Sequence, residues 1–236
     1  MKIALLGYGK MGKEIEKISI ERGHTISFIA DKNSNLKSIK GSDIAINFCT
    51  PKSAFKNIKM GLNNSIPVVS GTTGWLSNFS KIKELSIKTN TSFLYSSNFS
   101  LGVNLFFELN KKLAEIMKKY DNYNLNIEET HHIEKIDKPS GTAITLAENI
   151  IDKGKYNEWS INNKENYLSI ISKRVENILG THIVNYSSEI DSIEIKHIAK
   201  NRKGFALGAV IAAEWLIKNK GVFEMKDVIN DPNFKF

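Results

Sequence analysis

The segment Lys2–Gly12, KIALLGYGKMG, decides the fold expected for the first part of the chain. Its apolar half, Lys2–Leu6, has the composition of a buried parallel strand. Its second half has the spacing GxGxxG, in which glycines allow a tight turn and the next helix N-terminus can receive a pyrophosphate. The motif alone is a weak signal, but between a strand and a helix it predicts a dinucleotide site rather than a structural turn.

Strand and helix patterns alternate through the first hundred residues. Further strands are expected at residues 25–31, 43–51, 66–75 and 92–99, and helices at 13–22, 53–63 and 76–88. Strands that alternate with helices at this interval indicate βαβ units and an open parallel sheet with right-handed crossovers.

The second strand and two later strand ends supply the other candidate cofactor contacts. Asp31 can accept hydrogen bonds from ribose hydroxyls, which favours NADH, whereas Lys32 can attract a 2′-phosphate, which favours NADPH. Both cofactors therefore stay open. GTTG at 71–74 and SSNF at 96–99 follow strands at the sheet edge where such folds bind ligands, although these residue types also favour ordinary turns. The predicted cofactor contacts are Gly7, Tyr8, Gly9, Lys10, Met11, Gly12, Asp31, Lys32, Gly71, Thr72, Thr73, Ser96, Ser97, Asn98 and Phe99.

The pattern changes after Asn98. We expect a long helix at 101–120, a strand at 124–132, a helix at 143–152, a polar loop at 155–166, three strands at 167–175, 180–188 and 191–199, and an apolar helix at 205–221 followed by a short one. The fold class is therefore α/β. We expect an N-terminal Rossmann-type parallel sheet (1–100), an inserted α+β domain for substrate and oligomerisation (101–203), and C-terminal helices that return to the first domain (204–236).

The segment HHIEKIDKPSGTA, 131–143, carries the second candidate site. His131 and His132 are adjacent, so on a strand they point to opposite faces and cannot easily bind one metal ion together. No metal site is therefore predicted. Ser140 can cap the following helix, whose first-turn N–H groups can hold a carboxylate or phosphate. The two histidines and Lys135 add proton donors and positive charge, which favours a small anionic substrate and a general acid.

HHIEKIDKPSGTA closely resembles the HHxxKxDxPSGTA signature of the dihydrodipicolinate reductase family. GYGKMG, GTTGW, SNFSLGVN and HIAKNRKGFALGAVIAAEWL also resemble segments of that family, in the same order, so the resemblance covers nearly the whole chain. It departs at the first glycine loop, which is one residue shorter than the common GxxGxMG form.

This resemblance implies NAD(P)H-dependent hydride transfer to a cyclic unsaturated imine dicarboxylate, 4-hydroxy-tetrahydrodipicolinate, in lysine and diaminopimelate biosynthesis. By position in the motif, His131 resembles the general acid and Lys135 the second proton donor. His132, Ser140, Gly141 and Thr142 match substrate contacts. The resemblance also implies a homotetramer.

Composition limits the remaining possibilities. The net charge of +8 invites a nucleic-acid partner, but only Arg22, Arg174 and Arg202 are arginines and the lysines are scattered, so a solvated surface is favoured. No apolar run approaches the roughly 20 residues that span a bilayer. Cys49 is the single cysteine and fits a reducing cytoplasm. We therefore expect a cytoplasmic protein without nucleic-acid or membrane partners.

Two alternatives stay open on the sequence. One is another nicotinamide-dependent dehydrogenase, for which Cys49 lies at a suitable strand end but lacks a histidine nearby in the sequence. The other is a non-enzymatic nucleotide sensor in which the histidines are incidental.

Overall fold

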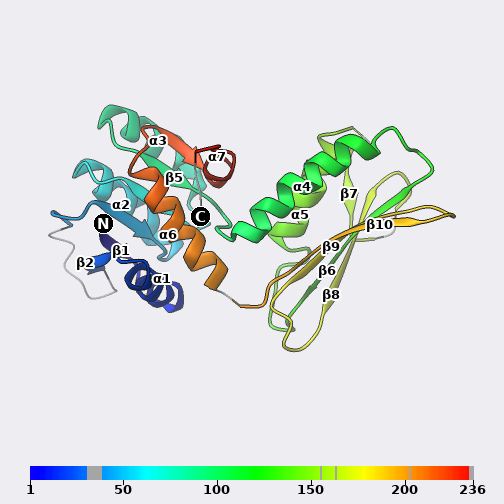
Figure 1. Cartoon of the computed structure of the whole chain (residues 1–236), viewed down its shortest axis with the longest axis horizontal. Helices are drawn as coiled ribbons and strands as arrows, with labels where there is room; N and C mark the ends of the chain where they lie inside the picture. Colours follow the sequence, from blue (N-terminus) through cyan, green and yellow to red (C-terminus); the bar gives the residue numbers. More distant parts are fainter. Residues whose placement is uncertain (31–38, 155, 163, 202, 234–236) are drawn as a thin grey trace. The chain divides into compact units, whose positions relative to one another are not determined.

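The computed structural model describes residues 1–30, 39–154, 156–162, 164–201 and 203–233. Asp31 and Lys32, the residues expected to choose between NADH and NADPH, lie outside these ranges. The chain divides into two compact units, Met1–Leu101 with Lys203–Phe236, and Gly102–Arg202 (Figure 1). Within the described ranges, no helix combines the length and apolar character needed to cross a membrane.

The first unit contains a six-stranded sheet in the order β11-β5-β4-β3-β1-β2, and all its strand pairs are parallel. The strands are β1 (Lys2–Leu6), β2 (Thr25–Ala30), β3 (Ile44–Asn47), β4 (Val68–Ser70), β5 (Phe93–Tyr95) and β11 (Val222–Glu224). Strand order reverses beside β1, because β2 lies on one side of it and β3 on the other. The carboxyl ends of β1 and β3 therefore flank the position where doubly wound sheets bind ligands.

Helices cover both faces of this sheet (Figure 1). They are α1 (Lys10–Glu21), α2 (Pro51–Asn63), the 3₁₀ turn η1 (Leu76–Asn78), α3 (Phe79–Lys88), α6 (Lys203–Leu216) and α7 (Met225–Ile229). Successive strand residues point to opposite faces. Ile3 and Leu5 consequently pack in a core with α1, α6 and α7, whereas Ala4 and Leu6 pack in a core with α2 and α3.

The second unit contains a five-stranded mixed sheet in the order β10-β9-β6-β8-β7. Its strands are β6 (Asn124–His131), β7 (Trp159–Ser160), β8 (Leu168–Arg174), β9 (Thr181–Ser187) and β10 (Ser192–Ile198). Strand β6 pairs parallel with β8 and antiparallel with β9. Helices α4 (Leu101–Met117) and α5 (Gly141–Ile151) cover one face of the sheet and form a core with its alternate apolar residues (Figure 1).

The expected fold class is confirmed, but several expected elements were wrong in detail. The segment expected as a polar loop contains β7, and the C-terminal segment contains β11, which the sequence pattern does not predict. Helix α1 begins at Lys10 rather than residue 13, so half of the glycine motif is already helical. Helix α2 begins at Pro51, because proline without an N–H is well suited to the first helical turn.

Candidate functional site

The glycine motif forms the turn from β1 into α1. Gly7 has a φ of 114°, and a Cβ there would collide with the Phe48 carbonyl oxygen. A Cβ on Gly12 would collide with the Gly7 carbonyl oxygen, so helix and turn are in close contact. Gly9 is the N-cap of α1 and offers no side-chain cap, and a Cβ on it would meet no atom within 4 Å. The space beside Gly9 at the N-terminus of α1 is thus open, and a helix N-terminus with open space beside it fits a pyrophosphate.

The other predicted cofactor residues follow β4 and β5, but not all of their side chains are available. Thr72 is 5% exposed, and its hydroxyl accepts a hydrogen bond from the Cys49 N–H at 2.9 Å. Phe99 is 1% exposed and belongs to the core. These two residues can therefore offer a ligand only backbone groups, whereas Thr73 and Ser97 are exposed.

The end of β6 brings a carboxylate and an imidazole to the same face of the second sheet. Leu125, Ile127, Glu129 and His131 alternate along β6 and are all buried on the side covered by helices. Across the sheet, Glu129 pairs in register with His182 of β9. His131 pairs with Arg174 of β8. Polar groups therefore replace apolar ones at this end of the core.

The Glu129 carboxylate is the centre of this cluster and is fully buried. Both of its oxygens accept a hydrogen bond from the Ser140 N–H at 3.1 Å, and Oε1 also accepts from the Arg174 guanidinium at 3.3 Å. Burial alone would raise the pKa of Glu129, but hydrogen bonds from His131 and Ser140 outweigh it and hold the pKa well below its usual value. The residue is therefore an anion.

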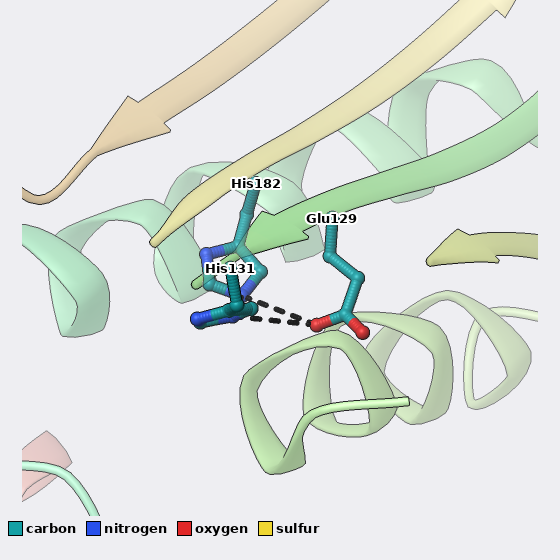
Figure 2. Close-up of side chains that lie close together, drawn as sticks. All are labelled: Glu129, His131 and His182. Atoms are coloured by element: carbon teal, nitrogen blue, oxygen red, sulfur yellow. Dashed lines mark hydrogen bonds and ion pairs between the residues drawn. The ribbon is translucent and has the colours of Figure 1, made fainter. Parts of the chain in front are cut away.

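The two imidazoles lie directly beside this carboxylate (Figure 2). The Nε2 atoms of His131 and His182 are 3.3 Å apart, and they lie 3.4 Å and 3.9 Å, respectively, from Oε2 of Glu129. Burial, reinforced by the neighbouring His131, lowers the pKa of His182 to about 3, so His182 is neutral near pH 7.

Arg174 connects the cluster to the segment that carries Lys135. Its guanidinium donates hydrogen bonds to the main-chain carbonyls of Lys135 and Asp137 as well as to Glu129. The Lys135 ammonium is paired with the Asp137 carboxylate at 2.8 Å. Arg174 therefore fixes the backbone of this segment, while the lysine side chain keeps an exposed carboxylate as its partner.

Helix α5 begins at Gly141, two residues before the expected start at residue 143, and Ser140 is its N-cap as predicted. The Ser140 hydroxyl accepts a hydrogen bond from the Ala143 N–H, and Gly141 is exposed. His132 lies just beyond the end of β6 and is partly exposed, unlike the buried His131. The structure thus places the two adjacent histidines in different environments.

Glu129, His131 and His182 also have the composition of a metal site. Each offers one ligand atom, and these atoms lie within 4.8 Å of one another. The negative charge of Glu129 is, however, already balanced within the protein, because its carboxylate accepts hydrogen bonds from Arg174 and from the Ser140 N–H. We therefore interpret the cluster as a hydrogen-bonded group that handles protons.

Three members of this cluster were missed from the sequence: Glu129, Arg174 and His182. The alternation in EETHH and in THIVNYS could have placed Glu129, His131 and His182 on buried faces. It could not have supplied the register that brings β6, β8 and β9 together.

Fold and site define a class of protein. A parallel doubly wound sheet with a glycine turn, joined to an inserted unit that carries imidazole and ammonium groups, is the plan of a nicotinamide-dependent oxidoreductase.

Comparison with known proteins narrows the class to one family. Family models described as dihydrodipicolinate reductase, N-terminus and C-terminus, match residues 1–99 and 102–229. A 4-hydroxy-tetrahydrodipicolinate reductase from Christiangramia forsetii is 52% identical over 236 residues, covering 98% of each chain. The reductase of the same name from Rickettsia rickettsii is 35% identical over 230 residues, covering 93% of this chain and 95% of that one.

A solved structure shares the fold. The dipicolinate-bound dihydrodipicolinate reductase from Paenisporosarcina sp. TG-14 superposes with a TM-score of 0.77 at 20% identity, over 97% of this chain and 99% of that one. The chain belongs to the dihydrodipicolinate reductase family, which confirms the resemblance seen in its motifs. It is accordingly a reductase whose N-terminal domain binds NAD(P).

Proposed function

We propose that this chain reduces 4-hydroxy-tetrahydrodipicolinate to tetrahydrodipicolinate with NADH or NADPH, in lysine and diaminopimelate biosynthesis. The observation that carries the proposal is the 52% identity to the Christiangramia forsetii reductase over 98% of both chains. The dipicolinate held by the Paenisporosarcina protein is itself a cyclic dicarboxylate, which supports a substrate of that chemistry.

The first unit would hold the cofactor, whose nicotinamide supplies the hydride. The open first turn of α1 at Gly9 is suited to the pyrophosphate, and Gly7 and Gly12 hold the turn against the helix. The segments after β4 and β5 would contact the rest of the cofactor through their backbone groups and through exposed side chains such as Thr73 and Ser97.

The second unit would bind the dicarboxylate and supply the protons. The N–H groups of Gly141 and Thr142 at the start of α5 suit a carboxylate, with Ser140 and His132 beside them. His131 would act as the proton donor, since imidazole exchanges protons near neutral pH. Lys135 would stabilise negative charge on the ring nitrogen and donate the second proton.

We further propose a homotetramer in the cytoplasm. The second sheet supports the assembly, because its face away from α4 and α5 carries exposed apolar side chains such as Ile171. Mass measurement in solution would test the assembly.

The test of the function is a coupled assay. Pyruvate and aspartate semialdehyde with the upstream synthase generate the substrate, and absorbance of each reduced nicotinamide cofactor is followed. We expect oxidation by the wild type and a loss of at least about 100-fold in His131→Ala and in Lys135→Met. Lys138→Met is the matched control, because this exposed lysine lies three residues further on and should leave the rate within roughly twofold. A folded protein that binds NADH or NADPH but oxidises neither in this assay would refute the proposal.

A further inference from the structure

Asn47 is a fully buried amide at the end of β3, and the proposed reaction assigns it no role. It pairs in register with Leu6 of β1 on one side and with Ser70 of β4 on the other. Asn47 therefore lies at the carboxyl edge of the sheet, where doubly wound folds bind ligands. A buried amide must satisfy its hydrogen-bonding groups within the protein, so its partners show what it holds in place.

The amide of Asn47 donates to hydroxyls at and just after the end of β4. Its Nδ2 atom lies 3.0 Å from Ser70 Oγ and 3.3 Å from Thr72 Oγ1. Its amide oxygen accepts a hydrogen bond from Asn57 Nδ2 of α2 at 3.4 Å. Its main-chain carbonyl accepts the Gly71 N–H at 3.0 Å. Asn47 thus joins β3, β4 and α2, and it holds the chain where the chain leaves β4.

Thr72 is fixed by this network through both its side chain and its backbone. Its Oγ1 atom accepts from Asn47 Nδ2 and from the Cys49 N–H at 2.9 Å, which uses both lone pairs of the hydroxyl. The hydroxyl hydrogen can be donated to the carbonyl oxygen of Asn47 or of Cys49, each 3.4 Å away. The Thr72 carbonyl accepts the indole N–H of the buried Trp75 at 2.7 Å. Thr73, the next residue, is exposed.

The segment 71–74 is consequently held in one place before any ligand arrives. Strand order places it two strands from β1, on the side away from β2, and thus beyond the pyrophosphate that the first turn of α1 would hold. We propose that Asn47 is a positioning residue that, through Thr72, fixes this segment against the nicotinamide half of the cofactor. This role rests on the proposed contact between the segment and the cofactor, and it is independent of which substrate is reduced.

Four substitutions separate positioning from general stability. Asn47→Leu removes the amide and keeps a side chain of similar volume. Thr72→Val removes only the hydroxyl, and Thr72→Ser restores it. Ser86→Ala is the matched control, because this buried hydroxyl donates to the Thr91 carbonyl just before β5 begins, at the opposite edge of the sheet.

The experiment is a fluorescence titration of each folded variant with the reduced cofactor, NADH or NADPH, that the wild type binds more tightly. A competition titration with ADP, which lacks the nicotinamide and its ribose, accompanies it. We expect Asn47→Leu and Thr72→Val to weaken binding of the reduced cofactor by about five- to tenfold, because a loosened segment must be ordered when the cofactor binds. Binding of ADP should stay within about twofold, since the N-terminus of α1 is unchanged.

The other variants and the coupled assay test whether the effect is one of position. Thr72→Ser should restore the affinity for the reduced cofactor, and Ser86→Ala should lower Tm without changing either affinity. In the coupled assay, the KM for the reduced cofactor should rise in Asn47→Leu by the factor seen in the titration. The KM for the dicarboxylate should stay within about twofold.

Two results would overturn the inference. One is a folded Asn47→Leu variant that binds the reduced cofactor as tightly as the wild type. The other is equal weakening of the reduced cofactor and ADP, because the damage would then extend to the pyrophosphate site. If Asn47→Leu does not fold, Thr72→Val decides by the same two criteria. The titrations need no turnover, so a protein that failed the reductase assay would still confirm or refute the role of Asn47.

Discussion

Replacing Arg174 by methionine removes the cation that balances a buried carboxylate. The guanidinium contacts Oε1 of Glu129 twice at 3.3 Å, and its side chain is 16% exposed while that of Glu129 is 0% exposed. It also donates to the carbonyls of Lys135 and Asp137. The substitution keeps most of the side-chain volume, so the main loss is the charge and its hydrogen bonds.

The magnitude follows from the burial of the pair. Removing one partner of a buried ion pair costs about 3–5 kcal/mol, because the other charge stays in the interior. The contacts between Arg174 and Glu129 are long and the guanidinium reaches solvent, which favours the lower end, about 3 kcal/mol. For a protein of this size, that corresponds to roughly 6–12 °C in Tm.

The measurement is urea unfolding of the wild type and Arg174→Met, with hydrogen exchange to locate the loss in β6, β8 and β9. The neighbouring Lys173→Met is the control. It breaks a more exposed ion pair with Glu128, with an Nζ–Oε2 distance of 2.6 Å and side chains 52% and 32% exposed, so it should cost about 0.5 kcal/mol or less.

A double-mutant cycle separates charge from packing. Glu129→Gln combined with Arg174→Met removes both charges, and we expect a coupling energy of about 1.5–2 kcal/mol between the two sites. Equal losses in Arg174→Met and Lys173→Met, or additive losses in the double variant, would refute the view that Arg174 stabilises a buried anion.

Other substitutions test the remaining features. Gly9→Ala should leave Tm unchanged but weaken NADH binding by about tenfold or more in a fluorescence titration, because the new Cβ occupies open space where the cofactor is expected. Gly12→Ala should instead lower Tm, because its Cβ would collide with the Gly7 carbonyl oxygen. The pKa of Glu129 is lowered in the folded protein, so this carboxylate contributes stability at pH values above the ordinary glutamate pKa of 4.5 and loses that contribution as the pH falls toward the lowered pKa. The urea midpoints of wild type and Glu129→Gln should therefore converge in acid. Gly180→Ala would place a Cβ 2.9 Å from His131 Cε1, so the ring must move and kcat in the coupled assay should fall while NADH affinity holds.

Most of the fold could be predicted because its signals are local. Glycine at 7, 9 and 12, proline at 51 and the apolar alternation along 124–131 each constrain the backbone near themselves. Strands β7 and β11 have only two and three residues, which is too short to show a period of two, and they form because neighbouring strands offer free edges.

The candidate site could be predicted only in part. His131, Lys135 and Ser140 belong to one continuous segment, so their residue types and spacing alone predict a proton-donating site beside a helix N-terminus. His182 and Arg174 reach that segment through strand pairing over long sequence separations, and pairing register depends on the whole sheet.

The first unit is discontinuous in the chain, and this affects its synthesis on the ribosome. Helix α6 supplies nine buried residues to the first unit, yet it follows the whole insertion Gly102–Arg202. At roughly 5–20 residues per second, the insertion takes about 5–20 s to translate. Throughout that interval the nascent parallel sheet lacks the helix that covers part of one face. The inserted unit can finish folding first. The nucleotide-binding unit can complete its hydrophobic core only after α6 has been synthesised.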